Sequence, residues 1–458
     1  MIECGFFPNL LNTKNNLIIA PAGYGKTYTI AELLKHVDKR QLILTHTNAG
    51  VASIRKKIRD FRINSSLYQV DTICGFAQRY FYAFYIGEIP SQEDKQFFQL
   101  IINQCVNIFE NKFIQTILIN TYERVIVDEY QDCTKQMHRM ILKISKELSL
   151  VALGDPLQGI FNFNDDLVNF EEDLRGFNTF ELNKPWRWEK TNPNLGNTIH
   201  ELRQQLNNSP CTIQLNQLKE SCRIIINNND YSGPIYKDIM QLLEKDDVLF
   251  IHPNSTNLTK RILFIQRFKN IPIILESLYD KDFLKLARKV DSISQNKLYS
   301  ELLDICCIMF NKTEIKKWIN PKRFIKKHNG IPQSFKNIEK QITKINLTQF
   351  LREVYNLDNI KCYRKELFWE LIKALREADI NNTSVYNEMR KIREIRSKYG
   401  RKVRNKAVGT TLLTKGLEFD TVVILEAHEF KDKNNFYVAV SRAKTELIII
   451  SERDTLYF

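Results

Sequence analysis

Seven short apolar runs, each bounded by turn residues, alternate with longer segments of helical periodicity along the 458 residues of the chain. Strands that are buried on both faces of a parallel sheet have continuous apolar sequences, and the segments that connect them form helices. The pattern therefore predicts an α/β fold with parallel sheets. The predicted strands lie at residues 17–20, 41–45, 124–127, 150–153, 248–251, 421–425 and 447–450.

Two long intervals lack this alternation and carry helical patterns instead. The longer one is rich in Lys, has few Gly, and has no clear strand pattern after residue 275. We therefore expect two α/β domains, each interrupted by a helical insertion. The expected boundaries are 1–75 and 121–175 for the first domain, 76–120 for its insertion, 176–256 and 407–458 for the second domain, and 257–406 for its basic insertion.

The composition narrows the class of protein to which the chain can belong. Lys and Arg number 67 against 53 Asp and Glu, and this net charge of +14 favours a polyanionic partner without identifying one. The nine cysteines form no C-x-x-C pair and no Cys/His cluster, so we expect reduced thiols. No apolar run approaches the ~18 residues of a membrane span. The first 16 residues have no signal-peptide pattern. We therefore expect a cytoplasmic protein with no membrane partner.

Residues 20–30 read APAGYGKTYTI, directly after the first predicted strand and at the start of a helical pattern. In this context the backbone N–H groups of a glycine-containing loop and the helix N-terminus bind the phosphates of a nucleoside triphosphate. Lys26 is expected to bridge the phosphates, and the Thr27 hydroxyl is expected to bind Mg²⁺. The loop residues in the predicted site are Ala22, Gly23, Tyr24, Gly25, Lys26 and Thr27.

Residues 125–132 read VIVDEYQD, an apolar strand that ends in two carboxylates. The carboxyl end of a strand beside a phosphate loop is where a second Mg²⁺ contact belongs. We expect Asp128 to hold the metal and Glu129 to deprotonate the attacking water, because the general base must be close to the metal ligand but distinct from it.

Further motifs follow in a fixed order: GDPLQGIFNF at residues 154–163, TKGLEFDTVVIL at 414–425 and FYVAVSRAK at 436–444. Together with the phosphate loop and DEYQD, this series resembles the UvrD/Rep family of superfamily 1 helicases. The resemblance implies two RecA-like P-loop domains, ATP and Mg²⁺ as cofactors, and an ATP-dependent translocase or helicase that moves 3′-to-5′ on single-stranded DNA.

The resemblance also implies roles for single residues around the nucleotide. Gln158 would sense the γ-phosphate, Arg187 and Arg442 would contact it as cations, and Glu418 would bind the ribose. Charge that spreads over a transferring phosphoryl group calls for such cations.

Tyr28 and Trp186 occupy the positions where the family stacks the base. No Gln precedes Gln41, so the usual reader of the adenine edge is absent and base selectivity is expected to be loose. Two aromatics packed in the core remain the alternative for this pair.

Residues 44–51, LTHTNAGV, and 71–76, DTICGF, match the family's first strand-contacting motifs, although Cys74 replaces a usual His. Single strands are held by stacking and by polar contacts to phosphate. For two of the predicted contacts, Phe161 and Phe163, core packing remains an alternative. The DNA-binding residues implied by the resemblance are His46, Thr47, Asn48, Thr72, Phe161, Phe163, Thr410 and Lys415.

Two basic stretches, at residues 315–328 and 390–406, are either solvated faces or nucleic-acid contacts. The second lies next to the motif-bearing core in sequence, so we favour it as a duplex or phosphate contact. The chain ends fourteen residues after Lys444, so no fused nuclease domain is expected.

Two other functions remain open at this stage. Compact members of the family resemble the helicase subunit of Gabija-type antiphage systems, which implies a DNA-end-activated ATPase switch that regulates a separate nuclease with little unwinding of its own. A motor on RNA is the third reading, and the DEYQD pattern favours DNA over it.

Overall fold

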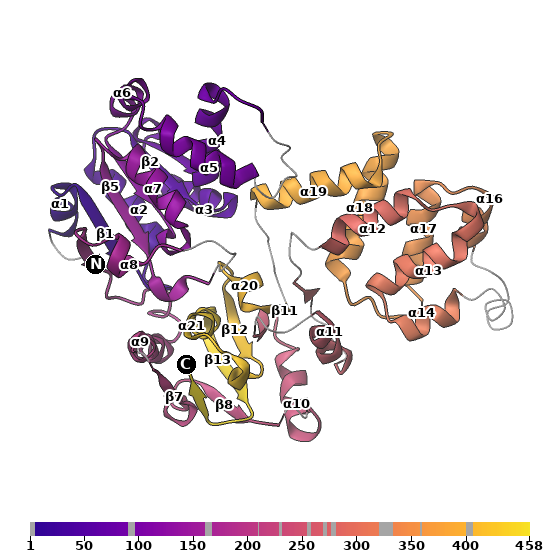
Figure 1. Cartoon of the computed structure of the whole chain (residues 1–458). Coiled ribbons are helices and arrows are strands. Elements are labelled where there is room, and N and C mark those ends of the chain that lie inside the picture. Colours follow the sequence, from indigo (N-terminus) through magenta and orange to yellow (C-terminus); the bar gives the residue numbers. More distant parts are fainter. Residues whose placement is uncertain are drawn as a thin grey trace. The chain divides into compact units, whose positions relative to one another are not determined.

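The structure is a computed structural model that describes residues 5–89, 97–160, 167–208, 210–228, 231–253, 258–268, 273–275, 281–319, 333–357, 360–399 and 406–458. The chain divides into two compact units (Figure 1). The first contains residues 1–228, 398–400 and 418–458, and the second contains residues 229–397 and 401–417.

The first unit is built around a six-stranded parallel sheet with the order β3-β2-β4-β5-β1-β6. Every residue of β2 and β4 is buried, because helices cover both faces of the sheet. The six strands are β1 (Asn15–Ile19), β2 (Gln41–Thr45), β3 (Tyr68–Thr72), β4 (Arg124–Val127), β5 (Ser149–Gly154) and β6 (Asn178–Glu181). All of them run in one direction, so their carboxyl ends meet at one edge of the sheet.

Helices of the first unit connect these strands and bury an apolar side against the sheet. Those between β1 and β5 are α2 (Lys26–Leu33), α3 (Asn48–Asp60), α4 (Ile73–Phe84), α5 (Phe97–Ile108), α6 (Lys112–Thr121) and α7 (Lys135–Ile144). Phe76, Phe81 and Phe97 on these helices, and Phe109 directly after α5, are fully buried in one cluster with residues of the sheet.

Three more parallel strands of the first unit pair in the order β8-β13-β12. They are β8 (Arg223–Ile226), β12 (Phe419–Ile424) and β13 (Ala443–Ser451), and they are accompanied by α9 (Pro193–Asn207) and α21 (Lys433–Val440). The short strands β7 (Thr212–Gln214) and β14 (Thr455–Tyr457) form a separate antiparallel pair.

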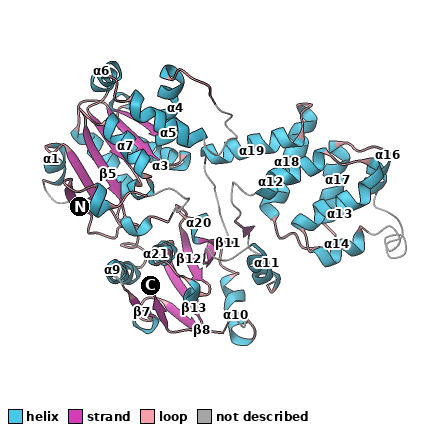
Figure 2. Cartoon of the chain, viewed as in Figure 1, coloured by secondary structure: helices cyan, strands magenta, loops and turns pink. Residues whose placement is uncertain are grey.

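The second unit contains three parallel strands in the order β10-β11-β9 and a larger helical part, seen in Figure 2 as a group of helices. The strands are β9 (Val248–His252), β10 (Ile273–Ile274) and β11 (Lys406–Thr410). A single apolar core joins the helices. They are α12 (Lys281–Asp291), α13 (Leu298–Met309), α14 (Lys312–Trp318), α16 (Gln333–Lys340), α17 (Lys344–Tyr355), α18 (Lys365–Ile380) and α19 (Val385–Tyr399).

The predicted α/β class with parallel sheets and helical insertions is confirmed, and each of the seven predicted strands is present. The strands that the sequence did not predict are β3, β6, β7, β8, β10, β11 and β14. β3 buries only Val70 fully and β6 buries none of its four residues, so neither shows a continuous apolar run. The domain boundaries stay a prediction. Within the described ranges, no helix has the length and apolar character needed to cross a membrane.

Candidate functional site

The predicted phosphate loop connects the end of β1 to the start of α2. Gly23 and Gly25 have φ angles of +79° and +87°, in the left-handed region that favours glycine. Gly25 is the N-cap of α2 and offers no side-chain acceptor to the first turn. The N–H groups at the start of α2 have no partner within the helix, so they can bind an anion.

The loop packs against the segment that carries Arg187. A Cβ added at Gly23 would lie 2.8 Å from Cζ3 of Trp188 and 2.9 Å from Cβ of Arg187. The backbone N–H of Arg187 donates to the carbonyl of Gly23 at 3.0 Å. A residue larger than glycine at position 23 therefore meets both strain and a steric clash.

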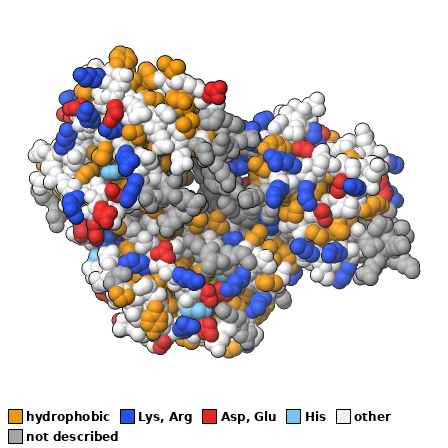
Figure 3. All heavy atoms as spheres, in the orientation of Figure 1, with side chains coloured by type: hydrophobic (Ala, Val, Ile, Leu, Met, Phe, Trp, Pro, Cys, Tyr) orange, Lys and Arg blue, Asp and Glu red, His pale blue; other side chains and the backbone are white. Residues whose placement is uncertain are grey.

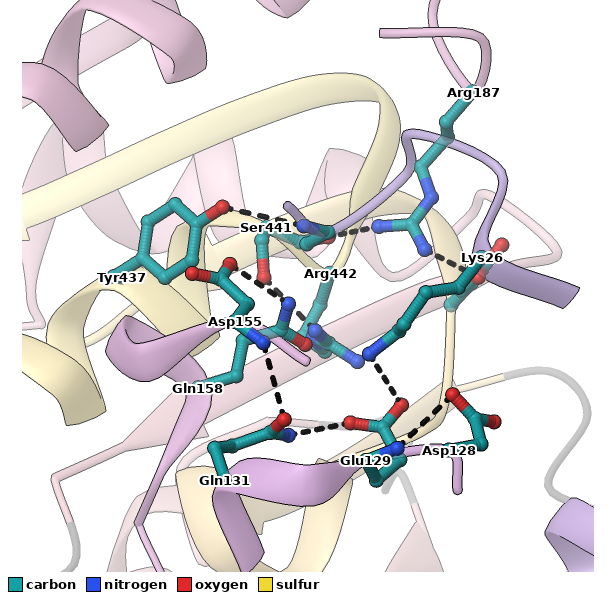
Figure 4. Close-up of polar contacts among 12 residues, drawn as sticks. Lys26, Asp128, Glu129, Gln131, Asp155, Gln158, Arg187, Tyr437, Ser441 and Arg442 are labelled. Atoms are coloured by element: carbon teal, nitrogen blue, oxygen red, sulfur yellow. Dashed lines mark hydrogen bonds and ion pairs between the residues drawn. The ribbon is translucent and has the colours of Figure 1, made fainter. Parts of the chain in front are cut away.

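Lys26 lies beside the two carboxylates that follow β4. The Nζ of Lys26 lies 2.7 Å from Oε1 of Glu129 (Figure 4). Asp128 is buried, and its Oδ1 accepts the backbone N–H of Glu129 at 3.0 Å. Burial and the neighbouring Glu129 raise the pKa of Asp128 to about 7, although Lys26 acts in the opposite direction. A bound cation would favour the charged form of this carboxylate.

The ammonium group of Lys26 stays protonated in this environment. Burial acts to lower the pKa of Lys26, but the carboxylates of Glu129 and Asp128 outweigh burial and raise it. The described residues contain no group of three His, Cys, Asp or Glu side chains that could hold a metal ion alone. One or two protein ligands completed by phosphate oxygens and water is the arrangement that Mg²⁺ commonly takes. The donor set therefore fits a nucleotide with its metal.

Glu129 is held in a strained backbone conformation at the start of a 3₁₀ turn, with φ 57° and ψ 43°. The amide nitrogen of Gln131 donates to Oε2 of Glu129, while Oε1 of Gln131 accepts the backbone N–H of Asp155 at 3.1 Å. These contacts fix the direction of the Glu129 carboxylate (Figure 4). Sequence reasoning assigned no role to Gln131, and its place inside DEYQD was the only signal.

Gln158 lies in the 3₁₀ turn η4 (Pro156–Gln158), which follows β5. Its Nε2 donates to Oδ2 of the fully buried Asp155 at 2.9 Å. Nδ2 of Asn434, on α21, donates to the carbonyls of Pro156 and Gly159 at 3.3 and 3.0 Å. The turn that carries Gln158 is therefore held on both sides.

The two predicted arginines are also brought together. Arg187 donates to the backbone carbonyl of Ser441, the residue before Arg442, and forms an ion pair with Glu418. Burial, with a contribution from nearby Arg187, lowers the pKa of Arg442 to about 10, so its guanidinium is charged at neutral pH. Nε of Arg442 donates to the carbonyl of Val438 at 2.9 Å, which aligns the side chain.

Tyr28 and Trp186 are exposed by 45% and 39%, so neither is a core aromatic. A Cβ added at Gly25 would lie 3.4 Å from Cδ1 of Trp186 and 3.7 Å from Cβ of Tyr28. Both aromatics therefore flank the same glycine of the phosphate loop. They are accessible to a planar ligand next to the phosphate site.

The DNA-binding residues predicted near β2 and β3 lie at the carboxyl edge of the first sheet, where Thr45 pairs with Thr72. Thr47 and Thr72 are the N-caps of α3 and α4, and their hydroxyls accept the backbone N–H groups of Gly50 and Gly75 at 3.0 and 2.9 Å. Each hydroxyl keeps its own O–H to donate. Asn48 begins α3.

The other predicted DNA contacts have varied positions. Nε2 of His46 lies 3.4 Å from Sγ of Cys133, inside the first unit. Thr410 and Lys415 belong to the second unit, where Thr410 ends β11 and is buried. Phe161 and Phe163 lie outside the described residues, as do parts of the basic stretches 315–328 and 390–406. Among the described residues on the face that Figure 3 shows, Lys and Arg side chains are spread among acidic and apolar ones.

The chain is similar to several known proteins. A family model described as an AAA domain matches residues 8–164. The chain is 24% identical over 357 residues to the Gabija protein GajB of Bacillus cereus (strain VD045), which covers 73% of this chain and 65% of that protein. It is 24% identical over 161 residues to the RecBCD enzyme subunit RecB of Buchnera aphidicola subsp. Acyrthosiphon pisum (strain APS), which covers 34% of this chain and 14% of RecB. The chain therefore spans less than two thirds of either relative.

Among solved structures, a Pif1 helicase from Bacteroides in complex with ADP-AlF3 and ssDNA is similar at a TM-score of 0.39 and 13% identity, over 98% of this chain and 92% of that one. The phosphate loop, the paired carboxylates and the parallel sheet define a P-loop nucleotide-binding fold. The matched AAA domain covers residues 8–164, and the ordered motifs resemble those of the UvrD/Rep family of superfamily 1 helicases.

Proposed function

We propose that the chain is an ATP-dependent translocase or helicase that moves 3′-to-5′ along single-stranded DNA. The observation that carries the proposal is the convergence of Lys26, Asp128 and Glu129 at the carboxyl edge of one parallel sheet. Ligands of open α/β sheets bind at this edge. The direction and the DNA substrate are proposed from the resemblance to the UvrD/Rep family.

Each group of the site then has a defined task. Lys26 and the first N–H groups of α2 bind the β- and γ-phosphates, while Thr27 and Asp128 hold Mg²⁺. ATP with its Mg²⁺ supplies the phosphoryl group that is transferred to water. Glu129, oriented by Gln131, accepts the proton of the attacking water.

The remaining groups stabilise charge and hold the base. Arg187 and Arg442 offset the negative charge that spreads over the phosphoryl oxygens, and preorganised cations of this kind contribute strongly to catalysis. Tyr28 and Trp186 stack on the base, and Glu418 binds the ribose after releasing Arg187. Gln158 reports the presence of the γ-phosphate.

On the nucleic-acid side, Thr47, Asn48 and Thr72 donate to phosphates of the strand at the sheet edge. His46, Phe161 and Phe163 are proposed to stack on bases, and Thr410 and Lys415 to contact the backbone of the strand. We therefore expect ATP hydrolysis to depend on a bound single strand.

The test is an ATPase assay of the purified chain with and without a poly-dT oligonucleotide, together with streptavidin displacement from biotinylated strands. We expect strong stimulation by the single strand and faster displacement from the 5′ end than from the 3′ end. ATP hydrolysis that does not respond to any single strand would contradict the proposed function. Faster displacement from the 3′ end would contradict the proposed direction alone.

The second candidate function is a DNA-end-activated ATPase switch that regulates a separate nuclease and unwinds little by itself. The similarity to the Gabija protein GajB, over 73% of this chain, favours it. A strand-separation assay on a 3′-tailed duplex distinguishes the two functions. Efficient unwinding by the chain alone supports the helicase, whereas stimulated ATPase activity without unwinding supports the switch.

A further inference from the structure

Helix α9 presents a polar side that the motif series does not include. The helix buries Leu195, Ile199, Leu202 and Leu206 on its apolar side. His200, Arg203 and Gln204 are spaced three and four residues apart, so they share another side. The contacts of these three side chains lead directly to the candidate nucleotide site.

Arg203 reaches the carboxylate that holds Gln158. The Nη2 atom of Arg203 lies 3.2 Å from Oδ1 of Asp155, and the Asp155 side chain is fully buried. Burial acts to lower the pKa of Arg203, but Asp155 is the first of several groups that together outweigh burial and raise it. A buried carboxylate requires such a partner, because the loss of one member leaves an uncompensated charge.

The two oxygens of Asp155 therefore have separate tasks. Oδ1 accepts from Arg203, and Oδ2 accepts from Nε2 of Gln158 at 2.9 Å. The orientation of the Gln158 amide therefore depends on the plane of the Asp155 carboxylate, and Arg203 contributes to fixing this plane.

One turn away, the same helix contacts the phosphate loop. The hydroxyl of Tyr24 lies 2.7 Å from Nδ1 of His200, and the two rings are stacked with their centroids 6.1 Å apart. Nε2 of His200 is 3.1 Å from Nε2 of Gln204. Tyr24 is buried, and burial raises its pKa to about 12, so the hydroxyl is neutral at physiological pH. α9 thus contacts both the loop that binds phosphate and the residue that holds Gln158.

We propose that Arg203 is a positioning residue of the ATPase, which sets the orientation of Gln158 through Asp155, and that His200 anchors the phosphate loop through Tyr24. The inference rests on the proposed ATPase function. In this proposal, α9 holds the Gln158 amide and the phosphate loop in a fixed relative position, so that hydrolysis responds to the bound strand.

The first test compares Arg203→Ala and Arg203→Lys with wild type, and uses Gln205→Ala, on an exposed position of the same helix, as the control. Loss of an oriented group lowers kcat by roughly 10- to 100-fold. We expect the KM for ATP and the affinity for a fluorescent ATP analogue to change by less than about threefold, because Arg203 touches no phosphate ligand. Stimulation by single-stranded DNA should fall with kcat.

Arg203→Lys keeps the charge beside Asp155 and protects the variant from unfolding, while it removes the planar fork of the guanidinium. A purely structural Arg203 predicts lower thermal stability with an unchanged kcat per folded molecule. Wild-type kcat in the folded Lys variant would therefore overturn the inference. An inactive wild-type protein would instead contradict the proposed function.

Hydrogen exchange gives a readout that does not depend on activity. The N–H of Gln158 donates to the Asp155 carbonyl at 2.8 Å, and the N–H of Gly159 donates to the Pro156 carbonyl at 3.2 Å. If Arg203 positions this turn, both amides exchange faster in the Lys variant than in wild type and the Gln205→Ala control. Equal exchange in all three proteins would overturn the inference even if the chain hydrolyses no ATP.

Discussion

The ammonium nitrogen of Lys26 lies 2.7 Å from Oε1 of Glu129, so the cation expected to bind phosphate is paired with the carboxylate expected to activate water. The pair is largely shielded from solvent on the Lys26 side, where 11% of the side chain is exposed. Binding of a phosphate must therefore exchange one anionic partner of Lys26 for another. This relationship makes Glu129 matter for affinity as well as for hydrolysis.

Glu129→Gln should bind ATP at least as tightly as wild type and hydrolyse it at least ~100-fold more slowly, as expected for loss of a general base. The amide removes the charge that competes for Lys26 but keeps the shape of the side chain. Nucleotide affinity is measured by fluorescence titration and turnover by phosphate release. Glu147→Gln, at an exposed position, is the control and should hydrolyse ATP like wild type. Retained turnover in Glu129→Gln would assign the base to another residue.

Gly23→Ala should abolish nucleotide binding and lower the free energy of unfolding. Gly176→Ala is a matched control, since Gly176 has a φ of +92° but no atom within 4 Å of an added Cβ. Both changes carry the backbone strain of a left-handed residue, about 1–3 kcal/mol. Only Gly23→Ala adds the clash with Trp188 and Arg187. If the two variants have equal free energies of unfolding in urea, the phosphate loop can move away from Trp188 and Arg187 without loss of stability.

Trp186→Ala should raise the KM for ATP about tenfold, because an aromatic stack contributes on the order of 1–3 kcal/mol per base. Tyr28→Ala should act in the same direction. Since no hydrogen-bonding reader of the adenine edge was found in the sequence, GTP should compete measurably with ATP in wild type. Competition assays with the two nucleotides test this. Strict selection of ATP would reveal a reader of the base that the motifs did not indicate.

His252 predicts a loss of stability in acid. The side chain is buried at the end of β9, and burial, with help from Arg261 and Lys260, lowers its pKa from 6.5 to about 3. Above pH 6.5 the ring is neutral in both states and its contribution is intact. As the pH falls from 6.5 towards 3, the unfolded chain takes up a proton that the folded chain resists, at about 1.4 kcal/mol per pH unit.

The comparison of wild type with His252→Phe isolates this effect. When the pH is lowered from 7 to 5, the unfolding free energy of wild type should fall by more than that of His252→Phe. Urea unfolding at the two pH values measures it. A difference that does not change with pH would mean that His252 takes up its proton equally in both states.

The sequence was sufficient to predict those strands and residues whose place in the fold follows directly from their local pattern. The strands β2 and β4 are buried at every position and appear as apolar runs, whereas the edge strand β6, NTFE, is mostly exposed and carries no such signal. Lys26, Asp128 and Glu129 could be predicted because each directly follows a predicted strand or loop signal.

The supporting residues could not be found in this way. Arg203 and Asp155 are in contact although they are 48 residues apart in the sequence. The hydroxyl of Tyr437 accepts the N–H of Ala22 at 3.3 Å, and these two residues are 415 apart. Such pairs exist only once the chain has folded, and neither Arg nor Tyr at these positions breaks a helical pattern. The fold class was thus accessible to sequence reasoning, whereas the contacts that orient the predicted site residues were not.

At position 129, the residue that best fits the left-handed backbone differs from the residue that the proposed hydrolysis needs. Selection for folding and selection for hydrolysis therefore favour different residues there. A library randomised at position 129 and selected only for soluble expression should enrich glycine and asparagine, which adopt φ near +57° with less strain. The same library selected for hydrolysis should return glutamate. In natural homologues, the residue at position 129 therefore indicates whether hydrolysis has been under selection. A glycine there would indicate a homologue that kept the fold but lost ATP turnover.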